Sequence, residues 1–185
     1  MARRRSEMET NYKVRSFDVD IPINEYRSLP KSPLFVVLDN LRSAFNVGSI
    51  FRLCDTMRVS GLYLCGYTAH PPNKKLAKTS LGTVDYVPWR HFEDTCEAVR
   101  TLQNDGTEVW AVETTSHARR YDSADYPSPV GLVFGNEALG VSREVLDICT
   151  GFVEIPTYGF KNSLNVATAV AVAGYRALEK HNFRW

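Results

Sequence analysis

Polar residues that could do chemistry stand in three short blocks, each where an apolar stretch gives way to a loop or a helix. The blocks are NVGSIFR (46–52), VFGNEALGVS (133–142) and IPTYGFKNSLN (155–165). The third block leads into an almost wholly apolar run of small residues, which predicts a helix packed on most sides. Asn162 or Ser163 can cap its first turn, but a helix N-terminus beside a loop can equally bind a ligand. These residues alone leave capping and chemistry both open.

In this order, the three blocks resemble the motifs of the SpoU (TrmH) family of RNA ribose 2′-O-methyltransferases, in the SPOUT superfamily. The resemblance covers residues 34–178, most of the chain. One block alone would be weak support, whereas three in order with suitable separations are highly specific. The resemblance implies S-adenosylmethionine as cofactor, no metal, and a deep trefoil knot in the C-terminal part of an α/β sheet. Nothing in the periodicity of the sequence indicates the knot, and threaded chains are rare.

Methyl transfer to a ribose hydroxyl is an in-line displacement of an already activated methyl group. The protein has to align the two reactants and help a weakly acidic hydroxyl lose its proton. Alignment alone can lower the barrier by about 7–11 kcal/mol. By resemblance, the catalytic residues are Asn46, Arg52, Glu137, Ser163 and Asn165.

Arg52 matches the catalytic arginine of the family. Because a guanidinium stays protonated, it is a poor general base, and we expect Arg52 to bind an RNA phosphate and stabilise the developing alkoxide. An ordinary exposed helix arginine is the alternative. Asn46 can hold the ribose or fix its loop. Glu137 can orient Arg52 or the network around Asn165, or it can favour a helix start through the dipole. Ser163 and Asn165 could hydrogen-bond the cofactor or the target ribose.

Cofactor binding is expected in the loops that follow strands, where α/β sheets bind their ligands. By resemblance, Gly135, Ile155 and Leu164 offer backbone groups to the adenine and ribose. Gly135 and Gly140 allow close backbone approach to a ligand, or alternatively form tight turns. The full set of cofactor-binding candidates is Glu113, Thr114, Gly135, Asn136, Gly140, Ile155, Ser163 and Leu164. The Gly-x-Gly-x-x-Gly fingerprint is absent, which argues against a dinucleotide site.

Basic side chains are concentrated in the first half of the chain. Net charge is +1, but residues 34–91 carry seven Lys or Arg against three acids, and residues 92–185 carry eight against thirteen. This excess would attract a polyanion, although ordinary surface variation also explains it. The RNA-binding candidates are Arg42, Arg52, Lys74, Lys75 and Lys78. The three lysines could instead form a solvated helix face, while Phe45, Tyr67 and Tyr158 could stack on a base or belong to the core.

Strands alternating with helices predict an α/β fold with a mostly parallel sheet and helices on both faces. Strands are expected at residues 34–38, 61–65, 85–89, 107–112, 131–134 and 152–155. Helices are expected at residues 46–57, 92–104 and 142–149, the last capped by Ser142, and in the final apolar run. In the first helix, Val47, Ile50, Phe51, Cys54 and Met57 fall on or near one stripe, which should be buried.

Residues 1–33 are expected to form a partly disordered arm that could contact RNA, and residues 34–185 the methyltransferase domain. Residues 14–23 alternate weakly and could form an edge strand. No apolar segment follows the basic residues 3–5, so a signal peptide is not expected, and no apolar run approaches the roughly 20 residues of a membrane span. We therefore expect a cytoplasmic protein with no membrane partner.

The four cysteines, Cys54, Cys65, Cys96 and Cys149, form no C-x-x-C pair, and the four histidines lack metal-ligand spacing. Buried, reduced thiols and no metal site are the expectation.

Length and composition fit one ordinary globular domain, because the chain has 185 residues, 44% hydrophobic and 23% charged. With the resemblance, the sequence predicts methyl transfer to a ribose 2′-hydroxyl of tRNA or rRNA. The resemblance also implies a homodimer in which both protomers complete each site. A non-catalytic RNA-binding module and a methyltransferase acting on an RNA base are the alternatives. The presence of all five catalytic candidates argues against a non-catalytic module. The sequence has nothing like the Cys-based apparatus of base C5 methylation, which argues against that kind of base methyltransferase.

Overall fold

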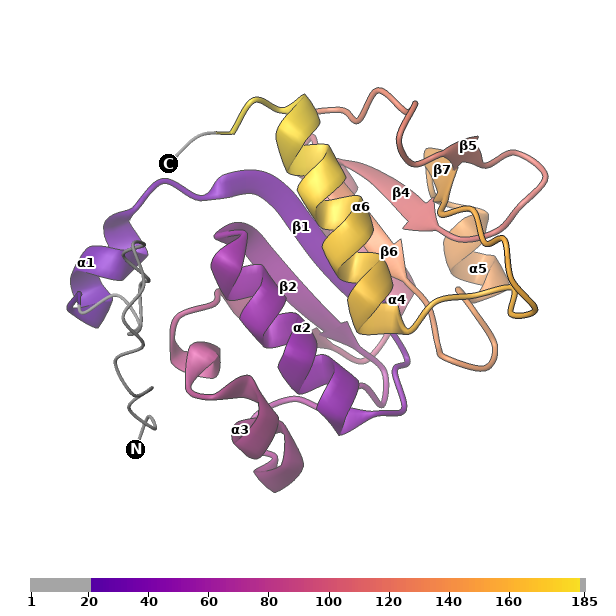
Figure 1. Cartoon of the computed structure of the whole chain (residues 1–185). Coiled ribbons are helices and arrows are strands. Elements are labelled where there is room, and N and C mark those ends of the chain that lie inside the picture. Colours follow the sequence, from indigo (N-terminus) through magenta and orange to yellow (C-terminus); the bar gives the residue numbers. More distant parts are fainter. Residues whose placement is uncertain (1–20, 184–185) are drawn as a thin grey trace, which may run out of the picture.

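A seven-stranded sheet with every neighbouring pair parallel forms the centre of the molecule (Figure 1). The computed structural model describes residues 21–183. The strands are β1 (Ser32–Asp39), β2 (Val59–Cys65), β3 (Trp89–Phe92), β4 (Glu108–Val112), β5 (Arg119–Arg120), β6 (Val130–Phe134) and β7 (Gly151–Glu154). The helices are α1 (Ile23–Ser28), α2 (Ala44–Thr56), α3 (Lys74–Ser80), the 3-10 helix η1 (Thr83–Asp85), α4 (Thr95–Asn104), α5 (Arg143–Leu146) and α6 (Val166–Lys180). The spatial order of the strands is β3-β2-β1-β6-β4-β7-β5, which confirms the expected mostly parallel α/β sheet.

Helices cover both faces of the sheet, and the central strands are therefore buried on both sides. In β1, Val36 and Leu38 belong to a core cluster shared with α2 and α6, whereas Val37 belongs to a second cluster shared with α4 and α5. Figure 1 shows α2 and α6 side by side over one face, with α4 and α5 behind the sheet. A continuous apolar run such as residues 34–38 suits this double burial. The trefoil knot implied by the resemblance stays a prediction.

Helix α2 buries the stripe that its sequence predicts. The buried residues of that stripe are Val47, Ile50, Phe51, Cys54 and Met57. The helix begins at Ala44, earlier than expected, because the Ser43 hydroxyl accepts a hydrogen bond from the backbone N–H of Asn46 at 3.3 Å. Asn46 therefore lies within the first turn of α2.

Several expected boundaries are wrong for local reasons. Residues 83–85 form η1, and β3 begins only at Trp89, after Pro88, because proline has no N–H to donate within a strand. Phe92 belongs to β3, and α4 begins at Thr95, where Asp94 accepts from the backbone N–H of Cys96 at 2.9 Å. Helix α5 covers only four residues, and the Ser142 side chain makes no capping hydrogen bond.

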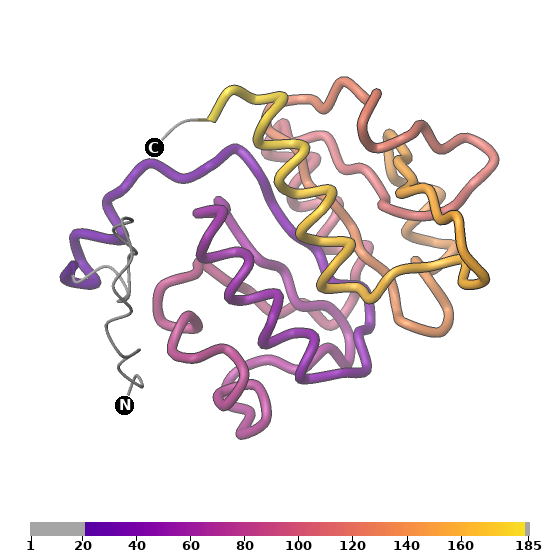
Figure 2. The backbone as a smooth tube through the Cα atoms, viewed as in Figure 1, coloured from indigo at the N-terminus to yellow at the C-terminus, as the bar shows by residue number. Residues whose placement is uncertain are grey.

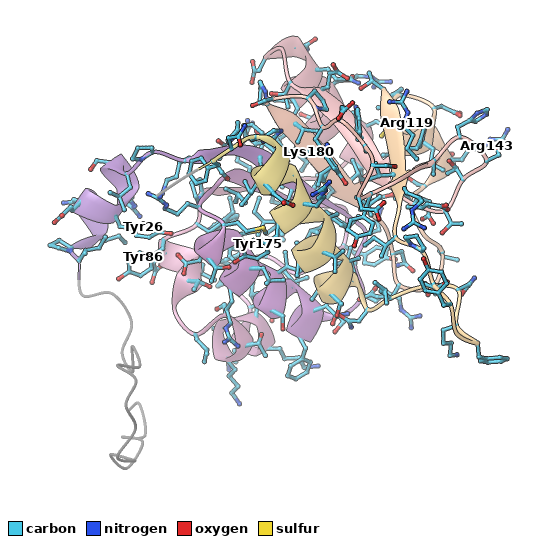
Figure 3. All side chains as sticks on the ribbon, turned by 45° about the horizontal axis from the view of Figure 1, so that its top comes forward. Tyr26, Tyr86, Arg119, Arg143, Tyr175 and Lys180 are labelled. Carbon is cyan, nitrogen blue, oxygen red and sulfur yellow. The ribbon has the colours of Figure 1, made fainter. Side chains whose placement is uncertain are left out.

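Residues 21–33 pack against the rest of the domain. The Tyr26 hydroxyl donates to the Asp55 carboxylate on α2, and the Tyr26 ring meets Tyr86 edge-on with centroids 5.1 Å apart (Figure 3). Strand β1 begins at Ser32, so the boundary expected between residues 33 and 34 falls inside a strand. Residues 1–20, with most of the edge strand expected at 14–23, lie outside the described residues, and Ile23 begins α1 instead. RNA contact by residues 1–33 stays a prediction.

All four cysteines are free thiols. Cys54, Cys65 and Cys96 are buried and Cys149 is half-buried. Burial raises the pKa of Cys65 and of Cys149 to about 12, so both thiols are protonated at neutral pH. Within residues 21–183, no helix is long and apolar enough to cross a membrane.

Gly48 allows α3 to approach α2 closely. A Cβ atom at this position would lie 1.8 Å from Thr79 Oγ1 and 2.6 Å from Thr79 Cβ. We expect Gly48→Ala to lower the free energy of unfolding by about 1–3 kcal/mol, the usual cost of overpacking. This loss should exceed the gain of up to about 1 kcal/mol that alanine brings to a helix interior. Urea denaturation of both proteins measures the difference.

Gly159→Ala is the matched control, because no heavy atom lies within 4 Å of a Cβ built at Gly159. It should change the free energy of unfolding by less than about 0.5 kcal/mol. Equal stability of Gly48→Ala and the wild type would contradict the requirement for glycine between α2 and α3.

Candidate active site

The three polar blocks meet at the carboxyl-terminal edge of the sheet, where Figure 2 shows the chain after β1, the chain after β6 and the segment before α6 coming together. Strands β1 and β6 are neighbours, so the loops that follow them lie side by side. One residue from each block, Asn46, Glu137 and Asn165, joins a continuous chain of hydrogen bonds. The blocks that resemble three sequence motifs are therefore in direct contact.

Glu137 lies at the centre of this network. Its Oε1 atom accepts from Asn46 Nδ2 at 2.9 Å and from the Ser43 N–H at 3.2 Å, and its Oε2 atom accepts from the Arg42 N–H at 2.9 Å. Burial raises the pKa of Glu137, but the hydrogen bonds from Arg42, Asn46 and Ser43 outweigh it, and the net shift of the pKa is downward. The ionised carboxylate therefore fixes both the loop before α2 and the orientation of Asn46.

Asn165 connects the network to α6. Its Oδ1 atom accepts from the N–H groups of Ala167 at 3.0 Å and Thr168 at 3.4 Å, and its Nδ2 atom donates to Asn46 Oδ1 at 3.1 Å. The expectation that Asn162 or Ser163 caps this helix is thus wrong, because α6 begins one residue after Asn165.

The direction of these bonds fixes both amides. The Asn165 oxygen must face the helix N–H groups, so its nitrogen faces the Asn46 oxygen, and the Asn46 nitrogen faces the Glu137 carboxylate. An amide NH₂ has two N–H donors. Each of the two asparagines uses one in this network, which leaves one N–H on each for a ligand.

The loop after β6 folds back on itself in a tight turn. Asn136 and Gly140 exchange two backbone hydrogen bonds, of 3.0 and 2.9 Å, and Gly140 has φ +73°. A Cβ at Gly135 would lie 2.1 Å from the carbonyl carbon of Gly140, so a side chain there would collide with backbone. The Asn136 oxygen closes the turn by accepting from the N–H groups of Ala138 and Leu139. Both glycines are needed for this turn, and their contact with a cofactor stays a prediction.

Two carboxylates hold the far end of this loop. Glu113 Oε2 accepts from the Val141 N–H at 3.0 Å, and Asp39 Oδ2 accepts from the Ser142 N–H at 2.8 Å. Asp39 is buried, and its other oxygen accepts from the Thr95 hydroxyl at 2.6 Å. Asp39 was not among the predicted site residues, although an acid at the end of a buried strand was an available signal. Thr114 is exposed beside Glu113.

The loop between β7 and α6 has unused backbone groups. Residues 155–164 are all described, and none of their N–H or C=O groups makes a backbone–backbone hydrogen bond with residues 21–183. Ile155 is half-buried, while Ser163 and Leu164 are exposed. Recognition of adenine and ribose by backbone groups requires N–H and C=O groups of this kind. The loop therefore fits the expected cofactor.

The basic candidates are exposed and stand outside the hydrogen-bonded network. Arg52 lies with Phe45, Ser49 and Thr56 on the exposed stripe of α2, and its guanidinium makes no hydrogen bond or ion pair with any residue of 21–183. Glu137 was expected to orient either Arg52 or the network around Asn165. The structure shows Glu137 in the Asn165 network and without a hydrogen bond to Arg52. The other basic candidates, Arg42 before α2 and Lys74, Lys75 and Lys78 on α3, are also exposed.

Comparison with known proteins assigns the family. The model of the SpoU rRNA Methylase family matches residues 33–175. The chain belongs to the SpoU rRNA methylase family. A tRNA (guanosine(18)-2′-O)-methyltransferase of Thermus thermophilus is 35% identical to this SpoU-family chain over 144 residues, which cover 78% of this chain and 73% of the relative. The chain spans 66% of the length of a TrmH-family protein of Staphylococcus saprophyticus, with 29% identity.

Solved structures of RNA-modifying enzymes share the fold. A TrmH/SpoU tRNA modifying enzyme of A. aeolicus superposes with a TM-score of 0.74 and 28% identity, covering 86% of this chain and 81% of that one. An AdoMet-bound rRNA methyltransferase from Sinorhizobium meliloti superposes with a TM-score of 0.76 and 27% identity, covering 89% of this chain and 62% of that one. These similarities confirm the family predicted from the three blocks.

The lowered pKa of Glu137 predicts a pH-dependent stability. Because the folded-state pKa is below the ordinary value of about 4.3, the ionised carboxylate stabilises the fold above that value. This contribution disappears as the pH falls through the folded-state pKa. Glu137→Gln should therefore be less stable than the wild type at neutral pH, and the difference should shrink as the pH falls below about 4.3. Urea denaturation over this pH range measures it.

Glu144→Gln is the matched control, because Glu144 is an exposed acid on α5 that accepts no hydrogen bond from residues 21–183. Its stability should follow that of the wild type at every pH. A difference between Glu137→Gln and the wild type that is the same at all pH values would contradict a role for the ionised carboxylate.

Proposed function

We propose that this protein transfers a methyl group from S-adenosylmethionine to a ribose 2′-hydroxyl of tRNA or rRNA. The observation that carries this proposal is the direct contact of the three motif blocks through Asn46, Glu137 and Asn165. The relatives support it, because the Thermus protein is named as a tRNA 2′-O-methyltransferase and the Sinorhizobium structure is an AdoMet-bound rRNA methyltransferase. The proposal includes a cytoplasmic location, where these substrates are available.

The roles follow from the geometry of the chain. S-adenosylmethionine, when bound, supplies a methyl group activated by a positively charged sulfur. The tight turn at residues 135–141 and the free backbone groups of residues 155–164 would hold its adenosine part. Asn46 and Asn165 would each donate their remaining N–H, with Ser163, to orient the target ribose. Alignment of this kind is the main contribution a protein can make to an in-line displacement.

Arg52 is available for the RNA because it is exposed and its guanidinium has no partner in residues 21–183. It would bind a phosphate beside the target nucleotide and stabilise the negative charge that develops on the 2′-oxygen. Glu137, which is occupied by Asn46 and the backbone of residues 42–43, keeps the start of α2 in place. Arg42 and the lysines of α3 would bind further phosphates.

We also propose that the protein acts as a homodimer through the outer surface of α2 and α6. These helices run side by side, tied at one end by Asn46 and Asn165 and at the other by the hydroxyls of Tyr175 and Thr56 at 3.1 Å. Three large apolar side chains are exposed on or next to them, Phe45 at 58%, Leu164 at 41% and Tyr175 at 44%. Contact with a second protomer would remove these apolar side chains from water, and Phe45 and Leu164 adjoin the candidate active site.

Transfer of labelled methyl from S-adenosylmethionine to bulk tRNA and rRNA tests the activity. Mass spectrometry of the digested RNA should find the label on the ribose of a 2′-O-methylated nucleoside. Arg52→Ala should abolish most transfer without loss of stability, because the side chain is exposed and its guanidinium has no hydrogen bond or ion pair within residues 21–183. If Arg52 stabilises the alkoxide, single-turnover rates should fall more than cofactor affinity. Arg52→Lys should recover little of the transfer activity, because lysine lacks the planar, forked donor group of arginine.

Arg100→Ala is the matched control, an exposed helix arginine on α4, on the opposite face of the sheet. It should retain wild-type transfer. Label found only on bases would support the base-methylation alternative, and absence of transfer with intact RNA binding would support the non-catalytic one. Near-normal turnover of Arg52→Ala would remove Arg52 from the mechanism.

Sedimentation equilibrium tests the dimer. The wild type should be dimeric at micromolar concentrations. Tyr175→Arg should shift the protein toward monomer, because it places a charge in the apolar surface of α6 (Figure 3). Arg100→Glu, a charge change on the other face, should leave the dimer intact. A monomeric wild type at tens of micromolar would contradict the proposal.

A further inference from the structure

A pocket of about 370 Å³ lies beside the candidate active site, at the carboxyl-terminal ends of β2 and β3. Its lining includes Tyr67, His70, Asn73, His91 and Glu93. None of the cofactor-binding candidates lines it, so it is separate from the loops after β4, β6 and β7. Because all strands are parallel, the pocket and those loops still open at the same edge of the sheet.

The pocket is attached to the active-site loops by direct hydrogen bonds. Asn136 Nδ2, in the tight turn after β6, donates to the Tyr67 hydroxyl at 2.6 Å. The Tyr67 N–H donates to Asn40 Oδ1 at 3.3 Å, in the loop that leads to α2. The Tyr67 ring itself remains exposed, with 62% of the residue accessible. Only the Tyr67 side chain would therefore separate a ligand in the pocket from the turn proposed for the cofactor.

Three rings with defined polar groups line this pocket. The His70 and His91 rings lie 4.1 Å apart with planes tilted by 35°. His70 Nδ1 is 3.0 Å from the Pro71 carbonyl oxygen, and His91 Nε2 is 3.0 Å from the Gly66 carbonyl oxygen. A carbonyl oxygen only accepts, so these two nitrogens are the donors, and the other nitrogen of each ring is an acceptor when the ring is neutral.

Glu93 adds a carboxylate at the rim, with 93% of its side chain exposed and an oxygen 3.9 Å from His91 Nδ1. The cluster is not a metal site, because no group of three suitable ligands occurs among the described residues. A carboxylate repels phosphate, which excludes the phosphate of RNA as the occupant of the pocket itself. Lys74 and Lys75, which directly follow the pocket residue Asn73, are placed for the phosphates instead.

We infer that this pocket binds one unpaired nucleobase of the substrate RNA, and that it prefers bases with N–H donors on their edge, above all guanine. Proteins commonly recognise single-stranded RNA through its bases, which stack on aromatic rings such as those of Tyr and His and form hydrogen bonds through their edges. The acceptors on His70, His91 and Glu93 suit the N1–H and amino groups of guanine and the amino groups of adenine and cytosine. Uracil presents one N–H between two carbonyl oxygens, which these acceptors would repel. This inference rests on the proposed action on RNA.

The test uses the full chain and fluorescently labelled single-stranded RNAs of about twelve nucleotides, within the usual site sizes of such proteins. All positions are uridine except one central residue, which is guanosine, adenosine, cytidine, uridine or an abasic ribose. Fluorescence anisotropy should show the tightest binding with guanosine and weaker binding with uridine and the abasic residue. Equal affinity for all five RNAs, or no binding to any of them, would overturn the inference.

Variants then locate the selectivity. His70→Ala should weaken binding of the guanosine RNA by about 5- to 150-fold, the usual value of one stacked base, and should leave the abasic RNA nearly unchanged. Glu93→Gln, at an exposed position that the fold does not depend on, should reduce the preference for guanosine over uridine. Lys74→Ala is the matched control. It should weaken the binding of all five RNAs by the same factor, because phosphate contacts carry no base selectivity. Loss of affinity in His70→Ala that is equal for guanosine and abasic RNAs would also overturn the inference.

Methyl transfer is measured separately, so that the two proposals can fail independently. Base-selective binding without any transfer would overturn the proposed function and leave the pocket assignment standing. Transfer with no base selectivity in either the wild type or the variants would overturn the pocket assignment alone.

Discussion

The arrangement of the site depends on one chain of hydrogen bonds that runs in a single direction. The N–H groups at the start of α6 bind the Asn165 oxygen, the Asn165 nitrogen binds the Asn46 oxygen, and the Asn46 nitrogen binds the Glu137 carboxylate. Reversing either amide would place donor against donor, so the helix end and the carboxylate together permit one orientation only. These bonds fix the orientation of both amides, and one N–H of each amide stays unused by the network.

The sheet order explains why this chain can form. Strand β6 follows β1 in space although about ninety residues separate them in sequence, so the turn at residues 135–141 lies against the loop that precedes α2. Asp39 and Glu113 then hold the end of that turn from the two strands beside β6. Each of the three loops is thus positioned by strands, and the side chains that could act on a substrate need little freedom of their own.

Local sequence signals were enough to predict the family and the parallel sheet. They were not enough to predict the contacts between segments that are distant in the sequence. The apolar run of β1 and the three polar blocks are features of short stretches, and the structure and the family comparison confirm both predictions. Ser163 and Asn165 are equally good caps by residue type, so only the actual start of α6 decides between them. The contact of Asp39 with the Ser142 N–H depends on β1 lying next to β6, for which the sequence has no local signal. Arg52 is different, because an exposed helix position was one of the alternatives open for its residue type, and the structure places it with Ser49 and Phe45 on the exposed stripe of α2.

The carboxyl-terminal edge of the sheet has two halves that carry different chemical groups, and the loop after β1 lies between these halves. On one side, the turns after β4, β6 and β7 present backbone groups and fixed carboxylates. On the other side, the loop after β2 presents the exposed ring of Tyr67, beside the half-buried rings of His70 and His91. Asn40 joins the halves, because its carbonyl oxygen accepts from Asn136 at 2.7 Å and its side-chain oxygen accepts from the Tyr67 N–H. This approach requires Gly66, where a Cβ would lie 2.0 Å from that side-chain oxygen. The same few atoms therefore set the distance between the proposed cofactor site and the proposed base pocket.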